Sequence, residues 1–231
     1  MENTKKMNNK VVVSYSGGMD STTLLYQLRS EKKDVYAVNF NYGSKHNEIE
    51  RSHAKAICAE IDVPYIEVEL PFVGDLFRSN LLMSGGDIPT GCYDKDTMSQ
   101  TVVPGRNGIF MSILAGYAES IEAESIAIAN HAGDHHIYPD CRPEWIESIG
   151  RTISLGSDGK VKLSSPFCKI SKSEICRIAK ELGVPLKKTW SCYKGESVHC
   201  GICGTCLERK EAFNGAGIKD PTIYKYYGHL R

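Results

Sequence analysis

The sequence predicts an α/β fold built on a largely parallel sheet, and two observations support this fold class. Short apolar runs alternate with segments of helical period along most of the 231 residues, which is the pattern of successive βαβ units. A turn rich in Gly and Ser, residues 16–21, joins the first apolar run directly to the first helical segment. A chain of this length fits one large domain, or one domain with an elaboration.

The first half of the chain contains three predicted strands, Val11–Val13, Val35–Phe40 and Tyr65–Leu70. Helices are expected between them over residues 20–29 and 45–61, because apolar residues recur there with a helical period. The second of these helices is expected to place near one face Ile49, Ala56, Ile57 and Ile61.

The second half continues the alternation after an irregular connection. Residues 71–101 are rich in Gly, Ser and Asp and too long for a usual α/β connection, so they form a lid or a mobile insertion, of which we prefer the lid. The elements expected next are a helix from Phe110 to Ile121, a strand at 125–129, a helix from Pro143 to about Leu155 and a strand at 161–163. Ser171–Glu174 is a capping box for a helix that Gly183 ends.

The turn Ser16-Gly17-Gly18-Met19-Asp20-Ser21 has the character of an anion cradle. Its glycines let the backbone approach a phosphate closely, and the helix that follows offers its positive N-terminus. The turn lacks the G-x-x-x-x-G-K-[ST] lysine that clamps a γ-phosphate, which favours cleavage at the α-phosphate of a nucleotide. It resembles the PP-loop of the ATP pyrophosphatase superfamily. The alternative is an ordinary tight turn between a strand and a helix.

Further polar residues are expected at the same edge of the sheet, where ligands bind in open parallel sheets. Arg106 is suited to hold phosphate bidentately and Asn107 to bond a ribose or base, unless they are a surface arginine and a capping asparagine. Lys172 stands in the first turn of its predicted helix, where a cation opposes the helix dipole unless an anion lies opposite. We therefore interpret Lys172 as a pyrophosphate ligand or, alternatively, as a solvated side chain.

The loop at 130–142 contains three histidines and two aspartates. Metal binding is one interpretation, but His135 and His136 are adjacent and point apart, so no ligand set is evident. A substrate-recognising loop is preferred, in which Asp140 accepts hydrogen bonds from a guanidine-like edge of a heterocycle.

Four cysteines near the C-terminus have metal-ligand spacing: Cys192, Cys200, Cys203 and Cys206. Thiolates two residues apart occupy adjacent corners of a tetrahedron, with Cys192 closing the site on a strand of its own, so a structural zinc ion is expected. An iron–sulfur cluster and unrelated buried thiols remain alternatives. His199 is expected beside the ligands rather than among them. Three further cysteines in periodic segments are interpreted as core residues: Cys58, Cys168 and Cys176.

Composition limits the partners and the compartment. Lys plus Arg and Asp plus Glu are equal at 28 each, so no overall field attracts nucleic acid or an anionic membrane, and a small-molecule partner is favoured. The start of the sequence is polar, and no run approaches the roughly 20 apolar residues of a membrane span. A cytoplasmic protein is expected, its nine cysteines being thiols or metal ligands rather than disulfides.

Four blocks of the sequence together resemble the 7-cyano-7-deazaguanine synthase family, of the pathway to queuosine and related 7-deazaguanines. They are residues 15–23, residues 103–107, residues 133–142, and residues 189–209 with their cysteines. The residues before Val11 are additional to the resemblance and are expected to be a disordered leader. The resemblance implies a Rossmann-like sheet of the adenine nucleotide alpha hydrolase type. It further implies a PP-loop domain over residues 1–187 and a zinc-binding C-terminal elaboration over residues 188–231.

The resemblance also implies an ATP-dependent C–N ligase. It would adenylate the carboxylate of 7-carboxy-7-deazaguanine, displace AMP with ammonia to give the amide, and activate the amide for conversion to the nitrile. Because the chain has no room for a glutaminase domain, free ammonium is expected as the nitrogen donor. A homodimer is expected, with the Cys-rich end or residues 224–227 as contacts.

Site residues follow from these blocks. Asp20, with Mg²⁺, and Ser21, Arg106 and Lys172 are assigned to catalysis. The ATP site is assigned to Tyr15, Ser16, Gly17, Gly18, Met19, Asp20, Ser21, Thr22, Thr23, Leu24 and Leu25. The substrate site is assigned to Asn107, His135, Tyr138, Asp140 and Arg142. One structural Zn²⁺ per chain is assigned to the four cysteines.

Three other functions compete with this one. A PP-loop tRNA-modifying enzyme such as a thiolase would adenylate a base, but the even charge balance counts against a tRNA surface. A cousin that stops at the amide would serve DNA modification, and the mass of its product would identify it. A non-enzymatic zinc-ribbon module would bind nucleic acid with strong salt dependence.

Overall fold

The structure, a computed structural model, describes residues 9–227. The expected leader falls mainly on residues 1–8, which lie outside the described residues. Five parallel strands form one sheet in the order β3-β2-β1-β4-β5. They are β1 (Lys10–Ser14), β2 (Asp34–Asn41), β3 (Tyr65–Glu69), β4 (Ser125–Ala127) and β5 (Lys162–Ser164). The predicted parallel α/β fold is confirmed, with β4 shorter than the sequence indicated.

The five helices expected from the sequence are present, and the described residues form three more, at 71–76, 95–98 and 204–216. In chain order the helices are α1 (Met19–Ser30), α2 (Asn47–Glu60), α3 (Pro71–Leu76), α4 (Lys95–Met98), α5 (Arg106–Ser120), α6 (Pro143–Gly156), α7 (Lys172–Glu181) and α8 (Gly204–Ala216). Four short 3-10 turns accompany them, η1 (Ser99–Thr101), η2 (Ala132–Asp134), η3 (Pro139–Cys141) and η4 (Leu186–Lys188). The predicted capping box is present at the start of α7, where the Ser171 side chain accepts from the Glu174 backbone N–H.

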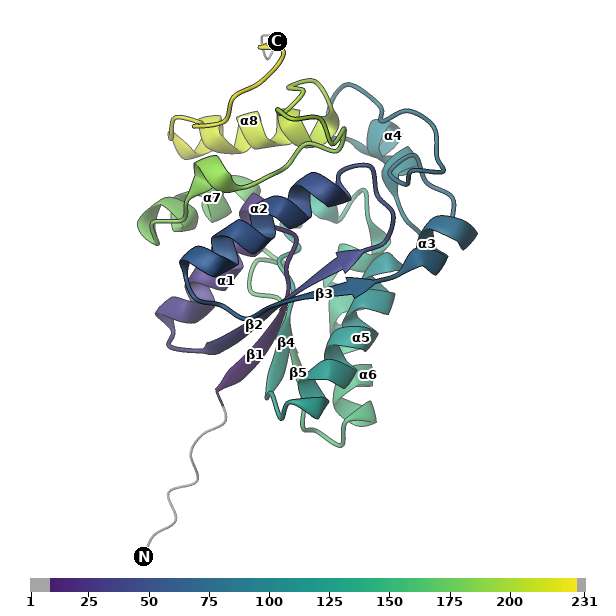
Figure 1. Ribbon diagram of the computed structural model, residues 1–231, viewed down its shortest axis with the longest axis vertical. Coiled ribbons are helices and arrows are strands. Elements are labelled where there is room, and N and C mark those ends of the chain that lie inside the picture. The colour runs from purple at the N-terminus through teal and green to yellow at the C-terminus, as the bar shows by residue number, and fades with distance from the viewer. Residues whose placement is uncertain (1–8, 228–231) are drawn as a thin grey trace, which may run out of the picture.

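Alternate residues of the strands bury opposite faces of the sheet, as the pleat requires. Val11 and Val13 of β1 pack in a core with apolar residues of α1 and α2. Val12, between them, packs in the other core with residues of α5 and α6. Figure 1 shows α1 and α2 on one side of the sheet and α5 and α6 on the other. Both faces are therefore covered, which explains why the strands read as continuous apolar runs.

Two local predictions from the sequence are wrong. Ala56 is exposed, and Ala54 and Cys58 are buried instead on the inner face of α2. The buried face still contains Ile57, so it is shifted around the helix by only part of a turn, which a short apolar pattern does not fix. Cys192, expected on a strand, lies outside regular secondary structure.

The irregular segment 71–101 is partly anchored. It contains α3, α4 and η1, and it buries Leu81, Leu82 and Met98. The Nζ of Lys45 donates to the carbonyl oxygens of Asn80, at 2.9 Å, and Leu82. Whether the segment closes over a ligand stays a prediction.

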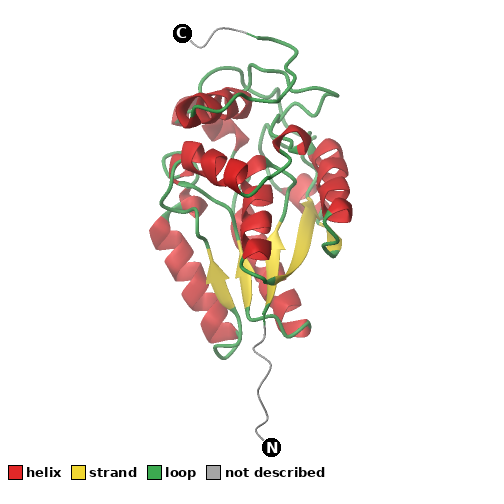
Figure 2. Cartoon of the chain, turned by 90° about the vertical axis from the view of Figure 1, so that its left-hand side faces the viewer, coloured by secondary structure: helices red, strands yellow, loops and turns green. Residues whose placement is uncertain are grey.

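The C-terminal segment lies across the carboxyl edge of the sheet. Figure 2 shows the strands pointing toward a layer of loops and helices that contains α8, at the end of the molecule opposite to the start of β1. α8 packs against α7. The proposed division at residue 187 therefore separates two elements that contact each other, and it remains a prediction.

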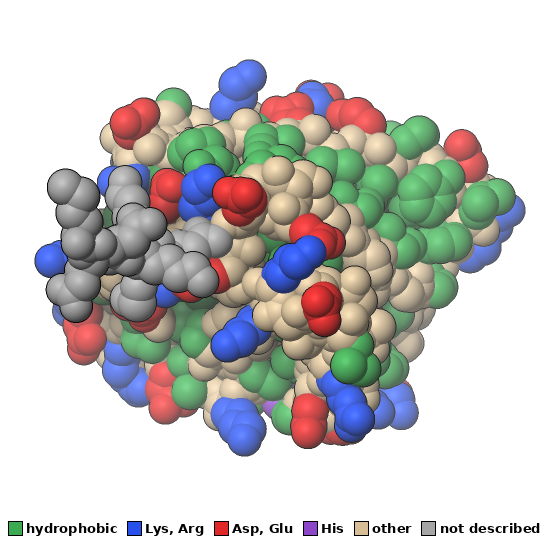
Figure 3. Space-filling model, turned by 90° about the horizontal axis from the view of Figure 1, so that it is seen from below, with side chains coloured by type: hydrophobic (Ala, Val, Ile, Leu, Met, Phe, Trp, Pro, Cys, Tyr) green, Lys and Arg blue, Asp and Glu red, His purple; other side chains and the backbone are tan. Residues whose placement is uncertain are grey.

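The described residues give no sign of a membrane span or of a one-sided charge field. No helix among them is long and apolar enough to cross a membrane. On the face seen from below, acidic and basic side chains alternate between hydrophobic patches (Figure 3). This mixture agrees with the equal numbers of acidic and basic residues.

Candidate active site

A pocket opens at the carboxyl ends of β1 and β4. The chain leaves β1 toward β2 and β3 and later returns to β4 on the other side of β1, which makes this the switch point where open α/β sheets bind ligands. Ser14, Tyr15 and Ser16 after β1 and Ile128 to His131 after β4 line the pocket. The position predicted for the site is thus the position of the pocket.

The 16–21 loop forms one wall of this pocket. Gly17 adopts φ +82, and a Cβ there would lie 2.8 Å from the backbone nitrogen of Ala54, so only glycine fits. Gly18 precedes α1 and provides no side-chain cap, which leaves the first N–H groups of α1 without an internal partner. The hydroxyls of Ser16 and Ser21 lie 3.2 Å apart. The loop therefore offers backbone donors and hydroxyls, as an anion cradle requires.

Five charged or polar side chains gather beside this loop, and we call them the lysine cluster: Asp20, His131, Asp134, Lys172 and Glu208. The Lys172 Nζ lies 2.7 Å from Glu208 Oε2 and 3.1 Å from Asp20 Oδ2. Burial alone would lower the pKa of Lys172, but the neighbouring carboxylates of Asp20, Glu208 and Asp134 outweigh it and raise that pKa. Lys172 is therefore a charged lysine paired within the protein, which excludes the solvated alternative.

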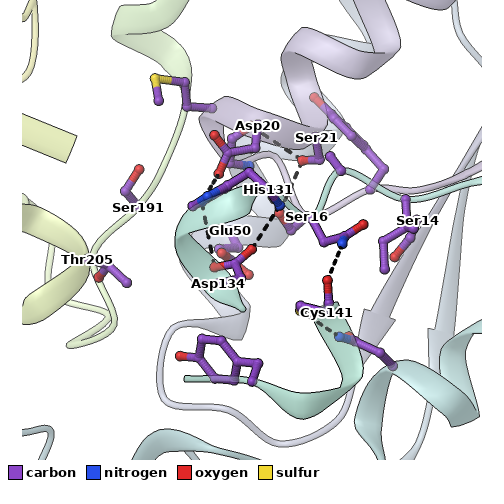
Figure 4. A pocket seen from close by; sticks show the side chains of 18 of the residues that line it. Ser14, Ser16, Asp20, Ser21, Glu50, His131, Asp134, Cys141, Ser191 and Thr205 are labelled. Atoms are coloured by element: carbon purple, nitrogen blue, oxygen red, sulfur yellow. Dashed lines mark hydrogen bonds and ion pairs between the residues drawn. The ribbon is translucent and has the colours of Figure 1, made fainter. Parts of the chain in front are cut away.

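His131 joins the carboxylates of the lysine cluster. Its Nδ1 accepts from the Gly133 N–H at 3.1 Å, so its Nε2 faces Glu208 Oε1 at 3.4 Å and Asp134 Oδ1 at 3.6 Å. Figure 4 shows Asp20, His131 and Asp134 turned toward one another. Burial raises the pKa of Glu208, against the opposing effect of Lys172. His131, Asp134 and Glu208 offer ligand atoms within 4.8 Å of one another and can hold a metal ion.

A second group in the same pocket surrounds Arg106, and we call it the arginine cluster: Tyr42, His46, Glu50, Arg106 and Tyr193. Arg106 Nη1 donates to the Tyr42 hydroxyl at 3.4 Å, and its guanidinium carbon lies 5.7 Å from the centre of that ring. His46 stacks on Tyr193 with ring centres 4.9 Å apart and places its Nε2 3.4 Å from Glu50 Oε2.

The Cys-rich segment, residues 189–209, forms another wall. Trp190, Ser191, Tyr193, Thr205 and Glu208 line the pocket, and Ser191 and Thr205 approach it from the C-terminal segment in Figure 4. The guanidinium of Arg209 is fully buried and donates to Thr189 Oγ1, Ser191 Oγ and the Leu186 carbonyl at 2.8–3.0 Å. This one side chain fixes the backbone that carries Trp190 and Ser191.

The four predicted cysteine ligands lie together and are buried. Cys200 Sγ and Cys206 Sγ are 3.9 Å apart and Cys203 Sγ and Cys192 Sγ are 4.0 Å apart, too long for disulfides of about 2.0 Å. A tetrahedron with Zn–S bonds of about 2.3 Å has edges of about 3.8 Å. Backbone N–H groups of Cys200 and Cys203 point at cluster sulfurs at 3.3 Å. The donor set thus fits a closed tetrahedral metal site.

The predicted site residues divide into those that line the pocket and those that lie behind it. Pocket-lining side chains or backbone belong to Tyr15, Ser16, Gly18, Met19, Asp20, Ser21, Arg106, Asn107, Tyr138 and Lys172. Thr22, Thr23, Leu24 and Leu25 are fully buried beneath the loop, so they support it instead of facing a ligand. Gly17 shapes the loop without belonging to the pocket lining.

Three predicted substrate residues are absent from the described pocket lining. The Asp140 carboxylate accepts from the backbone N–H of Asn107 at 3.3 Å and so stabilises the start of α5. The Arg142 Nε donates to the His135 carbonyl at 2.9 Å, which holds the 130–142 loop closed on itself. These residues shape the site from behind because their polar groups are engaged within the protein.

Several pocket residues were missed in the sequence. His131 lies in the 130–142 loop, and Asp134 and Glu208 lie within the four blocks, but none of them was assigned a role. His46 and Glu50 lie in a predicted helix that carries no motif. Spacing supplies no signal for these five, since α2, the 130–142 loop and α8 meet only in the folded chain.

Comparison with known proteins shows the family of the chain. The family described as queuosine biosynthesis protein QueC matches residues 10–217. A protein of Porphyromonas gingivalis named 7-cyano-7-deazaguanine synthase is 48% identical over 214 residues, 93% of this chain and 96% of that protein. Proteins of the same name from Desulfotalea psychrophila and Methanoregula boonei are 46% and 44% identical. They cover 92% and 94% of this chain and 97% and 99% of their own lengths.

A solved structure shares the fold at lower similarity. The U34-tRNA thiolase NcsA from Methanococcus maripaludis, solved with its [4Fe-4S] cluster, superposes with a TM-score of 0.50 and 18% identity. The match covers 96% of this chain and 77% of that one. This likeness supports the α/β fold alone.

Proposed function

The chain belongs to the queuosine biosynthesis protein QueC family, and we propose that it converts 7-carboxy-7-deazaguanine, ammonium and ATP to 7-cyano-7-deazaguanine. It is therefore an enzyme of queuosine biosynthesis. The observation that carries the proposed chemistry is the pocket itself. A glycine loop without a γ-phosphate lysine lies beside a buried lysine and opposite an arginine set among aromatic rings.

We assign the ATP phosphates to the 16–21 loop. The backbone donors at the start of α1 and the hydroxyls of Ser16 and Ser21 bind them, and the helix dipole favours their negative charge. The substrate carboxylate attacks the α-phosphorus, and pyrophosphate leaves. Lys172 and Arg106 stabilise the charge that develops on the phosphates.

The lysine cluster contains side chains that can bind Mg²⁺. Asp20 Oδ1 is buried without a hydrogen-bond partner among the described residues, and a buried carboxylate oxygen of this kind suits a hard cation. Bound Mg²⁺ would supply charge neutralisation for the phosphates. Asp20 would hold it, with His131, Asp134 and Glu208 beside it.

The two nitrogen-handling steps require positioning rather than a covalent enzyme intermediate. Ammonia attacks the acyl carbon and AMP leaves, giving the amide. The amide oxygen attacks the α-phosphorus of a second ATP and pyrophosphate leaves; loss of AMP and of both protons from nitrogen then gives the nitrile. Cys141 lines the pocket, but burial raises the pKa of its thiol far above neutrality, so it stays protonated and does not act as a nucleophile.

We place the heterocycle among the aromatic and amide side chains of the pocket, with Asn107 and Tyr138 in contact with it. Asp140, His135 and Arg142 act on recognition indirectly, by fixing the start of α5 and the 130–142 loop. The four cysteines bind one structural Zn²⁺. A homodimer in the cytoplasm, without nucleic acid, completes the proposal.

One incubation tests the proposed function. The zinc-loaded protein is mixed with Mg-ATP, ammonium and 7-carboxy-7-deazaguanine, and products are identified by mass spectrometry and nucleotide analysis. Nitrile together with AMP is expected. Formation of the amide alone would indicate the related enzyme that serves DNA modification. If neither product forms, 7-carboxy-7-deazaguanine is refuted as the acceptor. Replacing ammonium with glutamine should abolish turnover if free ammonium is the nitrogen donor.

A further inference from the structure

The arginine cluster contains buried polar atoms that the fold leaves without partners. His46 Nδ1 and Arg106 Nε have no hydrogen-bond partner among the described residues, and the His46 side chain is only 3% exposed. Unpartnered buried polar atoms are destabilising, so their retention in a pocket wall indicates a ligand that satisfies them. The ATP assignment uses the charge of Arg106 but gives no role to His46 Nδ1, because the 16–21 loop, the lysine cluster and Arg106 bind the phosphates.

The same cluster contains a carboxyl group with no cation paired to it. Glu50 Oε2 lies 3.4 Å from His46 Nε2, and no ion pair within the described residues joins Glu50 to Arg106. Burial raises the pKa of Glu50 to about 8, with Arg106 opposing the shift. Burial also lowers the pKa of His46 to about 3, and Arg106 adds to that effect. His46 is therefore neutral, and Glu50 changes charge near neutral pH.

Neutral His46 has one donor and one acceptor nitrogen. When Glu50 is ionised, His46 Nε2–H donates to it and Nδ1 becomes an acceptor without a partner. The groups facing this pair are Tyr42 from the end of β2, Arg106 from α5 and Tyr193 from the Cys-rich segment. They present phenol groups and one cation, and no second carboxylate among the described residues competes for the proton.

We infer that Glu50 and His46 form the ammonium site and that Glu50 accepts the proton which ammonium loses before its nitrogen attacks the activated carboxyl carbon. This inference rests on the proposed function. Ammonium brings four N–H donors and a positive charge, which suit the Glu50 carboxylate and His46 Nδ1. Its nitrogen has no lone pair, so the reaction requires deprotonation within the site.

The proton balance is complete. One N–H bond of ammonium breaks and an O–H bond forms on Glu50, so an ion pair becomes two neutral molecules. A poorly solvated pocket favours that change, and the positive charge of Arg106 disfavours retention of ammonium. Ammonia then attacks the acyl carbon, AMP leaves with the bonding electrons, and the amide nitrogen releases its extra proton to solvent. Glu50 releases its own proton to solvent before the next turnover.

The test compares Glu50→Gln with Glu48→Gln. Glu48 lies on the same helix, its side chain is 90% exposed and it pairs with Arg51, so its substitution should leave every rate unchanged. In Glu50→Gln, substrate-dependent exchange of pyrophosphate into ATP should persist. The value of kcat/KM for ammonium at pH 7 should fall about 100-fold or more. The difference in kcat/KM between Glu50→Gln and the wild type should decrease toward pH 9, because free ammonia then replaces ammonium in solution.

Hydroxylamine separates a proton-transfer role from a structural one. It is an unprotonated nucleophile at neutral pH, so Glu50→Gln should form the hydroxamate at the wild-type rate. In the wild-type enzyme, the rate with ammonium should rise with pH as Glu50 loses its proton near pH 8, whereas the rate with hydroxylamine should lack that rise. This pair of profiles needs no variant. His46→Gln should raise KM for ammonium more than it lowers kcat.

Several outcomes of these experiments would overturn the inference. Wild-type rates with ammonium at pH 7 in Glu50→Gln would overturn the inference, as would equal losses with ammonium and hydroxylamine or a loss of pyrophosphate exchange. Identical pH profiles for the two nucleophiles in the wild type would also overturn it. Failure of the proposed function is distinguishable, because the wild-type protein would then show no exchange dependent on 7-carboxy-7-deazaguanine.

Discussion

The 16–21 loop and the Cys-rich segment line the same pocket but are held in different ways. The loop is fixed by its neighbours in sequence, since β1 ends before it, α1 begins within it and the glycines meet its backbone requirements. The Cys-rich segment has no strand of the sheet within it, and it is fixed by four thiols and by buried Arg209. We therefore expect substitutions in the 16–21 loop and in the Cys-rich segment to have different effects on stability and activity.

The largest effect is expected from removing the metal site. Cys200→Ala leaves three thiols, and loss of metal binding that contributes on the order of 10 kcal/mol should disorder the segment that carries Trp190 and Ser191. Activity should fall to background, with less than one zinc per chain by elemental analysis. Cys92→Ala, at an exposed cysteine outside the cluster, is the control. Full activity in metal-free protein would contradict a structural role, and iron with visible absorbance would indicate an iron–sulfur cluster.

The next largest effect is expected at Arg209, which holds the same wall without metal. Arg209→Met removes the N–H groups from which Thr189 Oγ1 and Ser191 Oγ accept hydrogen bonds, and leaves Asp220, 3.7 Å away, without its cation. The free energy of unfolding should drop by about 3–5 kcal/mol, measured by urea denaturation of zinc-loaded protein. Arg177→Met, at an exposed arginine that bonds one carbonyl, should change it by less than about 1 kcal/mol. A similar drop in both variants would mean that Arg209 has no special role.

The loop wall is tested by Gly17→Ala. The new Cβ would meet the backbone of Ala54 at 2.8 Å in a conformation that alanine rarely adopts, so we expect a loss of about 2–4 kcal/mol together with weaker ATP binding. Gly159→Ala is the matched control, because Gly159 has φ +75 with nothing within 4 Å of the new Cβ. Gly159→Ala should lower the free energy of unfolding only by the cost of placing alanine at a positive φ, about 1 kcal/mol. Its affinity for ATP should be unchanged. Equal losses would show that close approach to α2 contributes nothing.

The smallest stability effect is expected at Lys172, which joins the two walls by pairing with Asp20 from the loop wall and Glu208 from α8. Lys172→Met should lower the free energy of unfolding by about 1–3 kcal/mol and lower kcat/KM for ATP about 100-fold. The raised pKa of Lys172 means that its contribution is complete below the unfolded pKa of about 10.4 and is lost only as pH rises above that value.

The stability difference between wild type and Lys172→Met should therefore be constant from pH 6 to pH 9, as chemical denaturation at several pH values would show. A difference that grows or vanishes within that range would mean that Lys172 is not a buried cation. Exposed Lys160, paired with Glu119 at 3.0 Å, is the comparison, because its replacement should change stability by less than about 1 kcal/mol.

The two walls also differ in how far the sequence predicted them. The loop could be assigned from six consecutive residues, because a strand, a glycine turn and a helix start are local features with fixed geometry. The cysteines could be assigned because ligand spacing is a local constraint as well. The arginine cluster could not be assigned, since His46 directly precedes α2 and Glu50 lies on it without any motif, and both reach Arg106 only in the folded chain.

The sequence by itself determined the parallel α/β fold, the loop at the end of β1, the four clustered thiols and the capped start of α7, because each depends on period, turn chemistry or ligand spacing within a few residues. Only the tertiary structure decided that Lys172 pairs with Glu208, that Asp140 faces the start of α5, and that His46 and Glu50 share a pocket with the 16–21 loop. These arrangements depend on how the helices rotate and pack across the edge of the sheet. Local sequence patterns do not determine this packing, which is set only when the whole chain buries its core.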